Sequence, residues 1–204
     1  MRVAVIGAGN IGGTLARKWV AAGHDVRIGA RDPQSDRTQS LVAALDRGVK
    51  VQPIEQAASE AEAVLFALPG AAMADTVAGL GDALAGKPVM DATNNLAPGG
   101  PLNSFAALTA AAPRAHLFRA FSTLGWENFA NPQLGGTQVD LFFCGPDGSA
   151  AELVRQLITD VGLRPIYVGG SEQVGVVDGL ASLWFALVFG QKRPRRTAFH
   201  LIEE

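Results

Sequence analysis

The sequence predicts an α/β fold: a Rossmann-like, doubly wound and mostly parallel sheet, followed by a small C-terminal α/β part that ends in a long apolar helix. Three observations support this prediction. Short apolar strands alternate along the chain with helical segments. The segment 63–68 is apolar throughout, as expected for a parallel strand covered on both faces. The 24 glycines among 204 residues suit the many tight turns of such a fold.

A glycine-rich turn near the N-terminus is the most informative motif. It follows an apolar strand at 3–6 and precedes a helix, and Gly7, Gly9 and Gly12 have the G-x-G-x-x-G spacing. In dinucleotide sites the first glycine permits the tight turn, the second lets a pyrophosphate approach the backbone, and the third lets the helix lie close to the strand. The helix N-terminus then faces the phosphates. The order strand, turn, helix favours a dinucleotide site over an ordinary turn without a ligand.

The end of the second strand, at 25–29, indicates which dinucleotide binds. NAD sites usually place an acidic residue here, which binds the ribose hydroxyls. This chain has Ala30 followed by Arg31. A small residue beside a guanidinium suits a 2′-phosphate, because arginine donates paired hydrogen bonds to phosphate oxygens. We therefore expect NADP(H) rather than NAD(H). Asp32 either begins the following turn, which we favour, or binds a ribose.

The rest of the chain alternates between strands and helices. Gly23 and Pro113 mark helix ends, and Asp147 precedes a helix as part of its cap. The segment 174–189 is apolar on nearly every face, which predicts burial between the main sheet and a further surface such as a second copy of the chain. Further strands are expected at 49–51, 63–68, 87–92, 115–121, 139–145 and 165–168, and helices at 11–22, 35–46, 54–60, 73–84, 103–112, 150–161 and 174–189.

Loops that follow the central strands are expected to meet at one edge of the sheet, where ligands bind in open α/β folds. Ala67, Leu68 and Pro69 end one of these strands and are expected to border the cofactor. Asn94 follows the next strand, and it either orients a ligand or caps its own turn. The aromatic-rich segment 122–129 either encloses a flat substrate over the nicotinamide end or only seals the join to the rest of the chain.

Composition argues against several classes of function. The net charge of −2 gives no sign of a nucleic-acid or membrane-surface partner. A single cysteine, Cys144, excludes an internal disulfide and a cysteine-based zinc site, and it lies in an apolar run typical of a core thiol. The three histidines are dispersed, so no metal site is expected. We also expect no membrane-spanning segment and no secretory signal, and hence a soluble cytoplasmic protein.

Taken together, these motifs give the chain a resemblance to a known family. The chain resembles the NADPH-dependent coenzyme F-420 reductases, the F-420H2:NADP oxidoreductases, over essentially its whole length. The resemblance rests on the segments 7–12, 29–31, 91–94 and 120–128, and the segment 162–165 and the apolar terminal helix also match. The first motif is shared by many Rossmann families, whereas the combination is more specific.

The resemblance implies an NADP-binding domain over 1–146 and a small domain over 147–204 that closes an acceptor cleft. It implies hydride exchange between NADPH and a deazaflavin, with catalysis by positioning and without a catalytic side chain. Ser122 stands where archaeal members carry a histidine, so a flavin is an alternative acceptor. The expected cofactor-binding residues are Gly7, Gly9, Asn10, Ile11, Gly12, Ala30, Arg31, Ala67, Leu68, Pro69, Asp91, Thr93 and Asn94. The expected substrate-binding residues are Ser122, Thr123, Leu124, Trp126 and Trp184.

Two classes of function therefore remain open. The first is an NADPH-dependent oxidoreductase of a deazaflavin or flavin, and the second is a non-catalytic NADP(H)-binding sensor whose acceptor cleft is filled by side chains. A reductase of imines or 3-hydroxy acids is disfavoured, because the segment after residue 150 is short for the helical domain of those enzymes. We expect a homo-oligomer, with a homodimer as the simplest form.

Overall fold

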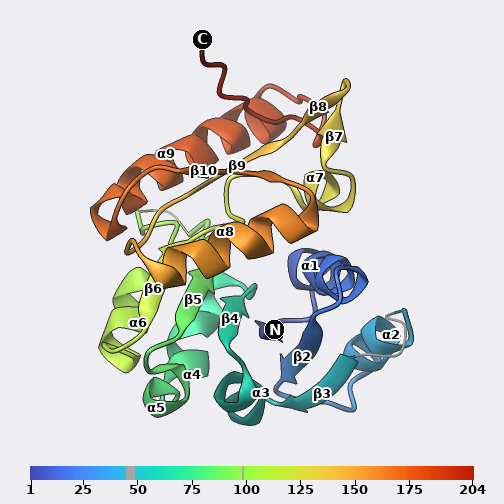
Figure 1. Ribbon diagram of the computed structural model, residues 1–204, viewed down its shortest axis with the longest axis vertical. Helices are drawn as coiled ribbons and strands as arrows, with labels where there is room; N and C mark the ends of the chain where they lie inside the picture. Colours follow the sequence, from blue (N-terminus) through green and yellow to red (C-terminus); the bar gives the residue numbers. More distant parts are fainter. Residues whose placement is uncertain (45–48, 98) are drawn as a thin grey trace.

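A computed structural model describes residues 1–44, 49–97 and 99–204. Its centre is a six-stranded parallel sheet with the order β3-β2-β1-β4-β5-β6 (Figure 1). The chain moves outward from β1 to β3, returns to β4, and continues outward on the other side, which confirms the doubly wound Rossmann-like prediction. The strands are β1 (Arg2–Ile6), β2 (Asp25–Ala30), β3 (Val49–Pro53), β4 (Ala63–Phe66), β5 (Pro88–Asp91) and β6 (His116–Arg119).

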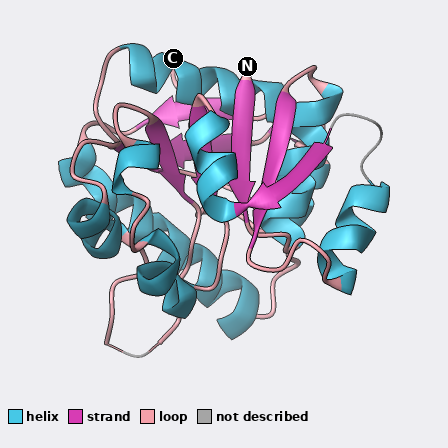
Figure 2. Cartoon of the chain, turned by 90° about the horizontal axis from the view of Figure 1, so that it is seen from below, coloured by secondary structure: helices cyan, strands magenta, loops and turns pink. Residues whose placement is uncertain are grey.

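Two layers of helices cover the sheet, as Figure 2 shows from below. Because side chains alternate along a strand, Val3 and Val5 belong to a core shared with α1 and α8, whereas Ala4 and Ile6 belong to a second core. That second core contains residues of α3, α4, α5 and α6. The helices are α1 (Asn10–Ala21), α2 (Asp36–Ala44), α3 (Ile54–Glu60), α4 (Met73–Val77), α5 (Gly81–Leu84), α6 (Phe105–Ala111) and α8 (Ser149–Val161).

The C-terminal part is built around a second, two-stranded parallel sheet. Strand β9 (Asp140–Phe143) pairs with β10 (Arg164–Tyr167), and α8 connects them. The predicted boundary at residue 146 therefore falls inside a β–α–β unit. An antiparallel bridge between Arg119 and Cys144 joins this unit to β6. In Figure 1, α8 lies between the six-stranded sheet and β9–β10, and the last helix, α9 (Val174–Phe185), lies on the far side.

Two expected elements differ from the structure. The predicted helix at 73–84 is interrupted between α4 and α5, because Gly79 adopts a positive φ of 83° that a helix does not accommodate. A short 3₁₀ turn, Gly70–Ala72, precedes α4. The segment expected as a loop at 122–129 includes the start of α7 (Trp126–Ala130), which is followed by a hairpin of β7 (Gln133–Leu134) and β8 (Thr137–Gln138).

The last helix is buried on one side only. Val177, Ala181 and Trp184 are buried, whereas Val176 and Leu183 are 58% and 47% exposed. A wider π-helical turn, Ala186–Gly190, continues the helix. Contrary to expectation, the span Ser171–Gly190 is long and apolar enough to cross a membrane by length and composition alone, with a mean hydropathy of 1.5 and 22% of it buried. Here the helix is docked on the fold, because its Asp178 pairs with Arg119 of β6.

Candidate functional site

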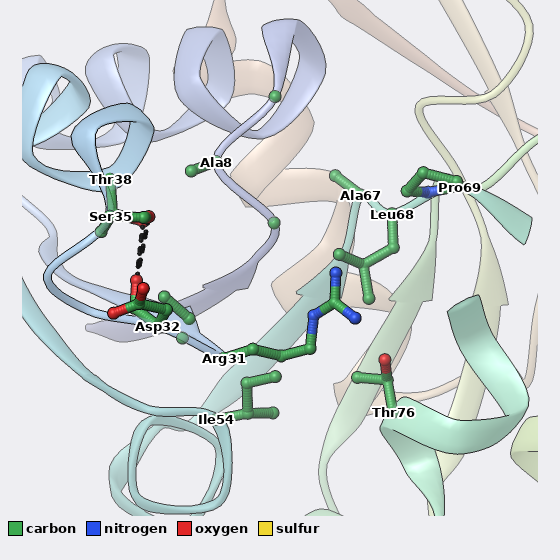
Figure 3. Close-up of a pocket in the computed structure, with 14 residues that line it drawn as sticks. Ala8, Arg31, Asp32, Ser35, Thr38, Ile54, Ala67, Leu68, Pro69 and Thr76 are labelled. Carbon is green, nitrogen blue, oxygen red and sulfur yellow. Dashed lines mark hydrogen bonds between the residues drawn. The ribbon is translucent and has the colours of Figure 1, made fainter.

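A cavity of about 560 Å³ opens at the carboxyl edge of the sheet, where the strand order reverses between β1 and β4. This volume is within the range of small-molecule and cofactor sites, and the position is the one at which open α/β sheets bind nucleotides. Figure 3 shows its wall. The lining residues are Gly7, Ala8, Gly9, Gly29, Ala30, Arg31, Asp32, Ser35, Thr38, Ile54, Ala67, Leu68, Pro69 and Thr76.

The glycine-rich turn forms one wall, and its geometry excludes side chains. Gly7 has a φ of 118°, and a Cβ atom there would lie 2.4 Å from the carbonyl oxygen of Ala67. A Cβ atom on Gly12 would lie 2.0 Å from the carbonyl oxygen of Gly7. The structural roles expected for these two glycines, a tight turn and close packing of the helix on the strand, are therefore confirmed. The result is a bare backbone surface that a pyrophosphate can approach.

Helix α1 begins at this turn, and no side chain accepts a hydrogen bond from its first N–H groups. Gly9 precedes the helix, no side chain caps it, and its first turn contains no acidic residue. The first N–H groups of a helix have no partner within the helix, and the helix dipole adds positive potential at this end. Asn10, Ile11 and Gly12 form this first turn, behind the cavity lining rather than in it. The turn is suited to an anion.

The loop after β2 supplies the charged part of the cavity. Arg31 is the only cationic side chain among the described lining residues, and it has no hydrogen-bond or ion-pair partner in the described part of the chain. Its guanidinium extends across the cavity between Ile54 and Leu68 (Figure 3). Asp32 adopts the turn role: its Oδ1 accepts a hydrogen bond of 3.0 Å from the N–H of Gln34.

Two hydroxyl residues of the cavity were not anticipated from the sequence. Ser35 and Thr38 both donate hydrogen bonds to the carbonyl oxygen of Asp32, over 3.0 and 3.3 Å. Ile54 and Thr76 were also missed, and they come from α3 and α4 on the far side of the opening. The spacing of Ser35 and Thr38 after Arg31 was a usable signal, because a helix start places hydroxyls beside the preceding loop. Nothing in the local sequence indicated Ile54 or Thr76.

Besides the first turn of α1, three more of the expected cofactor-binding residues lie outside the cavity lining. Asp91 is fully buried, and its carboxylate accepts hydrogen bonds from the N–H and hydroxyl of Thr93 and from the N–H of Ser104. Asn94 accepts a hydrogen bond from Arg119 and donates one to the carbonyl oxygen of Ser122. These side chains therefore hold two loops together at the end of β5 and β6, and none of the three lines the cavity.

The expected substrate-binding residues are mostly buried. Ser122, Thr123 and Leu124 are 5% exposed or less, and the Ser122 and Thr123 hydroxyls have no hydrogen-bond partner among the described residues. Trp126 is half-buried at the start of α7. Trp184 is 3% exposed and donates its indole N–H to the carbonyl oxygen of Thr197. The described cavity wall contains none of the five.

The comparisons with known proteins agree with this geometry. Residues 2–95 match the family model described as NADP oxidoreductase coenzyme F420-dependent. A hypothetical protein of known structure from Sinorhizobium meliloti is 30% identical, with a TM-score of 0.72 over 83% of this chain and 85% of that chain. The chain belongs to the NADP oxidoreductase family.

Other members and relatives extend the comparison. A provisionally assigned F420-dependent NADP reductase from Arthrobacter sp. FB24 matches this chain with a TM-score of 0.80 over 93% of this chain and 94% of that chain, at 24% identity, which shows the shared fold. A glycerol-3-phosphate dehydrogenase, NAD(P)+, of Parvibaculum lavamentivorans is 27% identical over 94% of this chain. The chain spans only 36% and 60% of the length of two curated relatives.

Proposed function

We propose that this protein transfers hydride between NADPH and a deazaflavin such as coenzyme F-420, or a flavin. The observation that carries the proposal is the cavity at the β1–β4 reversal, with its side-chain-free glycine wall and a single unpaired guanidinium among its described residues. The matching family description supports the same cofactor and names coenzyme F420.

The cavity residues fit NADP(H) at both of its charged groups. The turn at Gly7 and Gly9 and the first N–H groups of α1 would hold the pyrophosphate. Arg31, beside the small side chain of Ala30, would hold the 2′-phosphate by charge-assisted hydrogen bonds. Oδ1 of Asp32 accepts the N–H of Gln34, which supports the turn role for this residue over a ribose contact.

Catalysis would need positioning rather than a reacting side chain. Bound NADPH would supply the hydride, and the residues that follow β4 would hold its nicotinamide ring. Ala67, Leu68 and Pro69 line the cavity there and would exclude water from one side of the ring. We propose that the loop containing Ser122 and Thr123, with Leu124 and Trp126, borders the acceptor. The two unpartnered hydroxyls support this placement.

A non-catalytic NADP(H) sensor is the second candidate. It is favoured by the burial of Leu124 and Trp184, because such a protein is expected to fill its acceptor cleft with side chains. The two candidates share the nucleotide site and differ only in whether a second ring can bind.

The wider assignments are also proposals. Residues 1–146 would bind the nucleotide, and 147–204 would close the acceptor side. We propose a cytoplasmic homodimer that needs no nucleic acid or membrane.

A groove of about 440 Å³ on α9 supports a second copy as partner, because Val176 and Leu183 protrude beside Gly179, whose face is open. The protruding side chains of Val176 and Leu183 lie on the same face as the groove. Two copies related by a two-fold axis could therefore each insert these side chains into the groove of the other.

Anaerobic NADPH oxidation with coenzyme F-420, FMN and FAD in parallel tests the catalytic proposal. Oxidation of NADPH with any of the three acceptors supports an NADPH-dependent reductase, provided that it is faster than oxidation of NADH with the same acceptor. Tight NADPH binding without turnover on the whole panel would instead establish the sensor. Failure to bind NADPH would refute both.

A further inference from the structure

Arg119, the last residue of β6, is fully buried, and each of its three guanidinium nitrogens donates at least one hydrogen bond. Its Nη1 donates to the carbonyl oxygens of Asp91 and Thr93, over 3.0 and 2.5 Å. Its Nη2 donates to Oδ1 of Asn94 over 2.8 Å. These three acceptors lie in and directly after β5, so one planar group fixes the backbone of the β5 loop at several points.

Asn94 extends this arrangement to the neighbouring loop. While its Oδ1 accepts from Arg119, its Nδ2 donates to the carbonyl oxygen of Ser122 over 3.1 Å. The β5 and β6 loops are therefore joined through one amide side chain. The residue before Ser122, Phe121, adopts a positive φ of 58°, an unfavourable conformation for a residue with a large side chain. Such a backbone persists only where its surroundings hold it.

The fourth partner of Arg119 comes from the C-terminal part of the chain. Its Nε donates to Oδ1 of Asp178 on α9 over 2.8 Å, and Oδ2 of Asp178 accepts from Asn103 over 2.7 Å. The Asp178 side chain is 14% exposed. Asp178 of α9 thereby connects this helix to the carboxyl edge of the sheet, through its ion pair with Arg119 and its hydrogen bond from Asn103.

We propose that Arg119 is a positioning residue for hydride transfer, and that Asp178 on α9 holds it in place. This inference rests on the proposed function. Both loops lie at the edge where the nicotinamide and the acceptor would meet, and hydride transfer depends on the distance and angle between two rings. We call the Arg119–Asp178 pair and Asn94 the clamp. Loss of the clamp would therefore slow hydride transfer. The phosphate-binding turn and Arg31 lie on the other side of the β1–β4 reversal and would stay in place.

The test compares Asp178→Ala and Arg119→Lys with the full-length wild type. Arg119→Lys keeps the charge but loses the planar set of donors. NADPH affinity is measured by fluorescence titration. The kcat and the acceptor KM are measured by NADPH oxidation with FMN and with coenzyme F-420. The deuterium isotope effect on kcat is measured with NADPH labelled at C4. We expect kcat to fall by about ten- to a hundredfold and the isotope effect to rise. NADPH affinity should change by no more than about twofold.

Two further variants keep the result decisive. Asp82→Asn removes an acidic partner from an exposed ion pair with Arg114, and it should leave every measurement unchanged. Asn94→Ala breaks the bridge between the loops at a half-buried position, and it replaces Arg119→Lys should that variant fail to fold. Combined with Asp178→Ala, it should cost less than the sum of the two single changes, because both act through one network.

The outcomes separate the inference from the proposed function. A wild type that oxidises NADPH, with clamp variants that retain its kcat, overturns the inference alone. Variants whose kcat and NADPH affinity fall together with thermal stability show a purely structural role, which also overturns it. A wild type without turnover on coenzyme F-420, FMN and FAD refutes the proposed function, and the inference with it.

Discussion

At the scale of single residues, the nucleotide cavity depends on positions where no side chain fits. A methyl group on Gly12 would lie 2.0 Å from a backbone oxygen, which cannot move without displacing the whole turn. A methyl group there would push α1 away from β1, so it would disturb the packing of the core as well as the cavity. The same crowding does not apply to glycines of α9, because a Cβ atom added to Gly175 would meet nothing within 4 Å.

Gly12→Ala is therefore expected to destabilise the protein by about 1–3 kcal/mol, the usual cost of forcing an extra methyl group into a packed site. NADPH affinity should fall as well, because the helix N-terminus moves. Urea unfolding and NADPH titration measure the two effects. Gly175→Ala is the matched control, and it should leave stability unchanged or slightly raised. Equal stability of the two variants would contradict the packing argument.

Arg31→Ala is expected to weaken NADPH binding more than NADH binding. A hydrogen bond to a charged group contributes about 1.5–3 kcal/mol, which corresponds to about tenfold to a hundredfold in affinity. Titration of both nucleotides into the wild type and the variant measures the difference. Arg114→Ala, at an exposed site in another part of the fold, is the control. A loss of the same size for NADH and NADPH would exclude the 2′-phosphate role.

Cys144 should be unreactive in the folded protein. Burial raises the pKa of its thiol to about 11, so at pH 8 about one thousandth of it is thiolate. Alkylation by iodoacetamide at pH 8, followed by mass spectrometry, should be slow in buffer and fast in denaturant. Rapid modification of the native protein would show that the thiol is accessible and would contradict its place in the core.

At the scale of elements, Asp140 holds the C-terminal unit together. Its fully buried carboxylate accepts two hydrogen bonds from Arg164 on β10, of 2.6 and 2.7 Å, and one of 2.6 Å from the N–H of Leu201. One side chain at the start of β9 thereby fixes both the neighbouring strand and the C-terminal segment. Without these partners a buried carboxylate would be strongly unfavourable.

Asp140→Asn is expected to lower stability at neutral pH by about 1.5–3 kcal/mol. Burial alone would raise the pKa of this carboxyl, but the hydrogen bonds from Arg164 and Leu201 lower it below its ordinary value of 3.8. A carboxyl whose pKa is lower in the folded state stabilises the fold above pH 3.8, and the contribution is lost as the pH falls below that value. Urea unfolding at about pH 7 and about pH 3 should therefore show a difference that shrinks in acid. A pH-independent difference would exclude the ionic contribution.

At the scale of the whole molecule, the exposed side of α9 is the most unusual surface. Val176 and Leu183 of α9 are each about half exposed, and so is Phe189 in the π-helical turn that follows the helix. Large apolar side chains gathered on one surface commonly mark an interface. The apolar groove beside them is bordered by β9 and β10, so the surface includes both the helix and the small sheet.

Leu183→Glu is expected to convert the proposed dimer into a monomer, because it places a charge in an apolar interface. Light scattering after size exclusion measures the mass. Glu152→Ala, on the exposed side of α8, is the control and should leave the mass unchanged. A monomeric wild type, or a variant that stays dimeric, would contradict an interface at this face.

The sequence alone determined the sheet and the glycine-rich wall of the cavity. Both depend on local patterns: apolar runs of strand length, and glycines at positions where a Cβ atom would collide with a neighbouring backbone. The place of Ala30 and Arg31 in the cavity could also be predicted. They follow a strand of the parallel sheet, and the carboxyl ends of such strands lie at the edge where ligands bind. The patterns themselves lie within a few consecutive residues, so they can be recognised before the path of the whole chain is known.

Only the tertiary structure decided what the polar residues at the end of β5 and directly after it do. Asp91, Thr93 and Asn94 have the chemistry of ligand-binding groups, but Arg119 and Ser104 take up their hydrogen bonds. Asp178 likewise lies in an otherwise apolar helical segment, and only the fold brings it to a buried guanidinium 59 positions earlier in the chain. A polar side chain binds whichever partner the packing brings within about 3 Å, and that partner is set by the path of the whole chain.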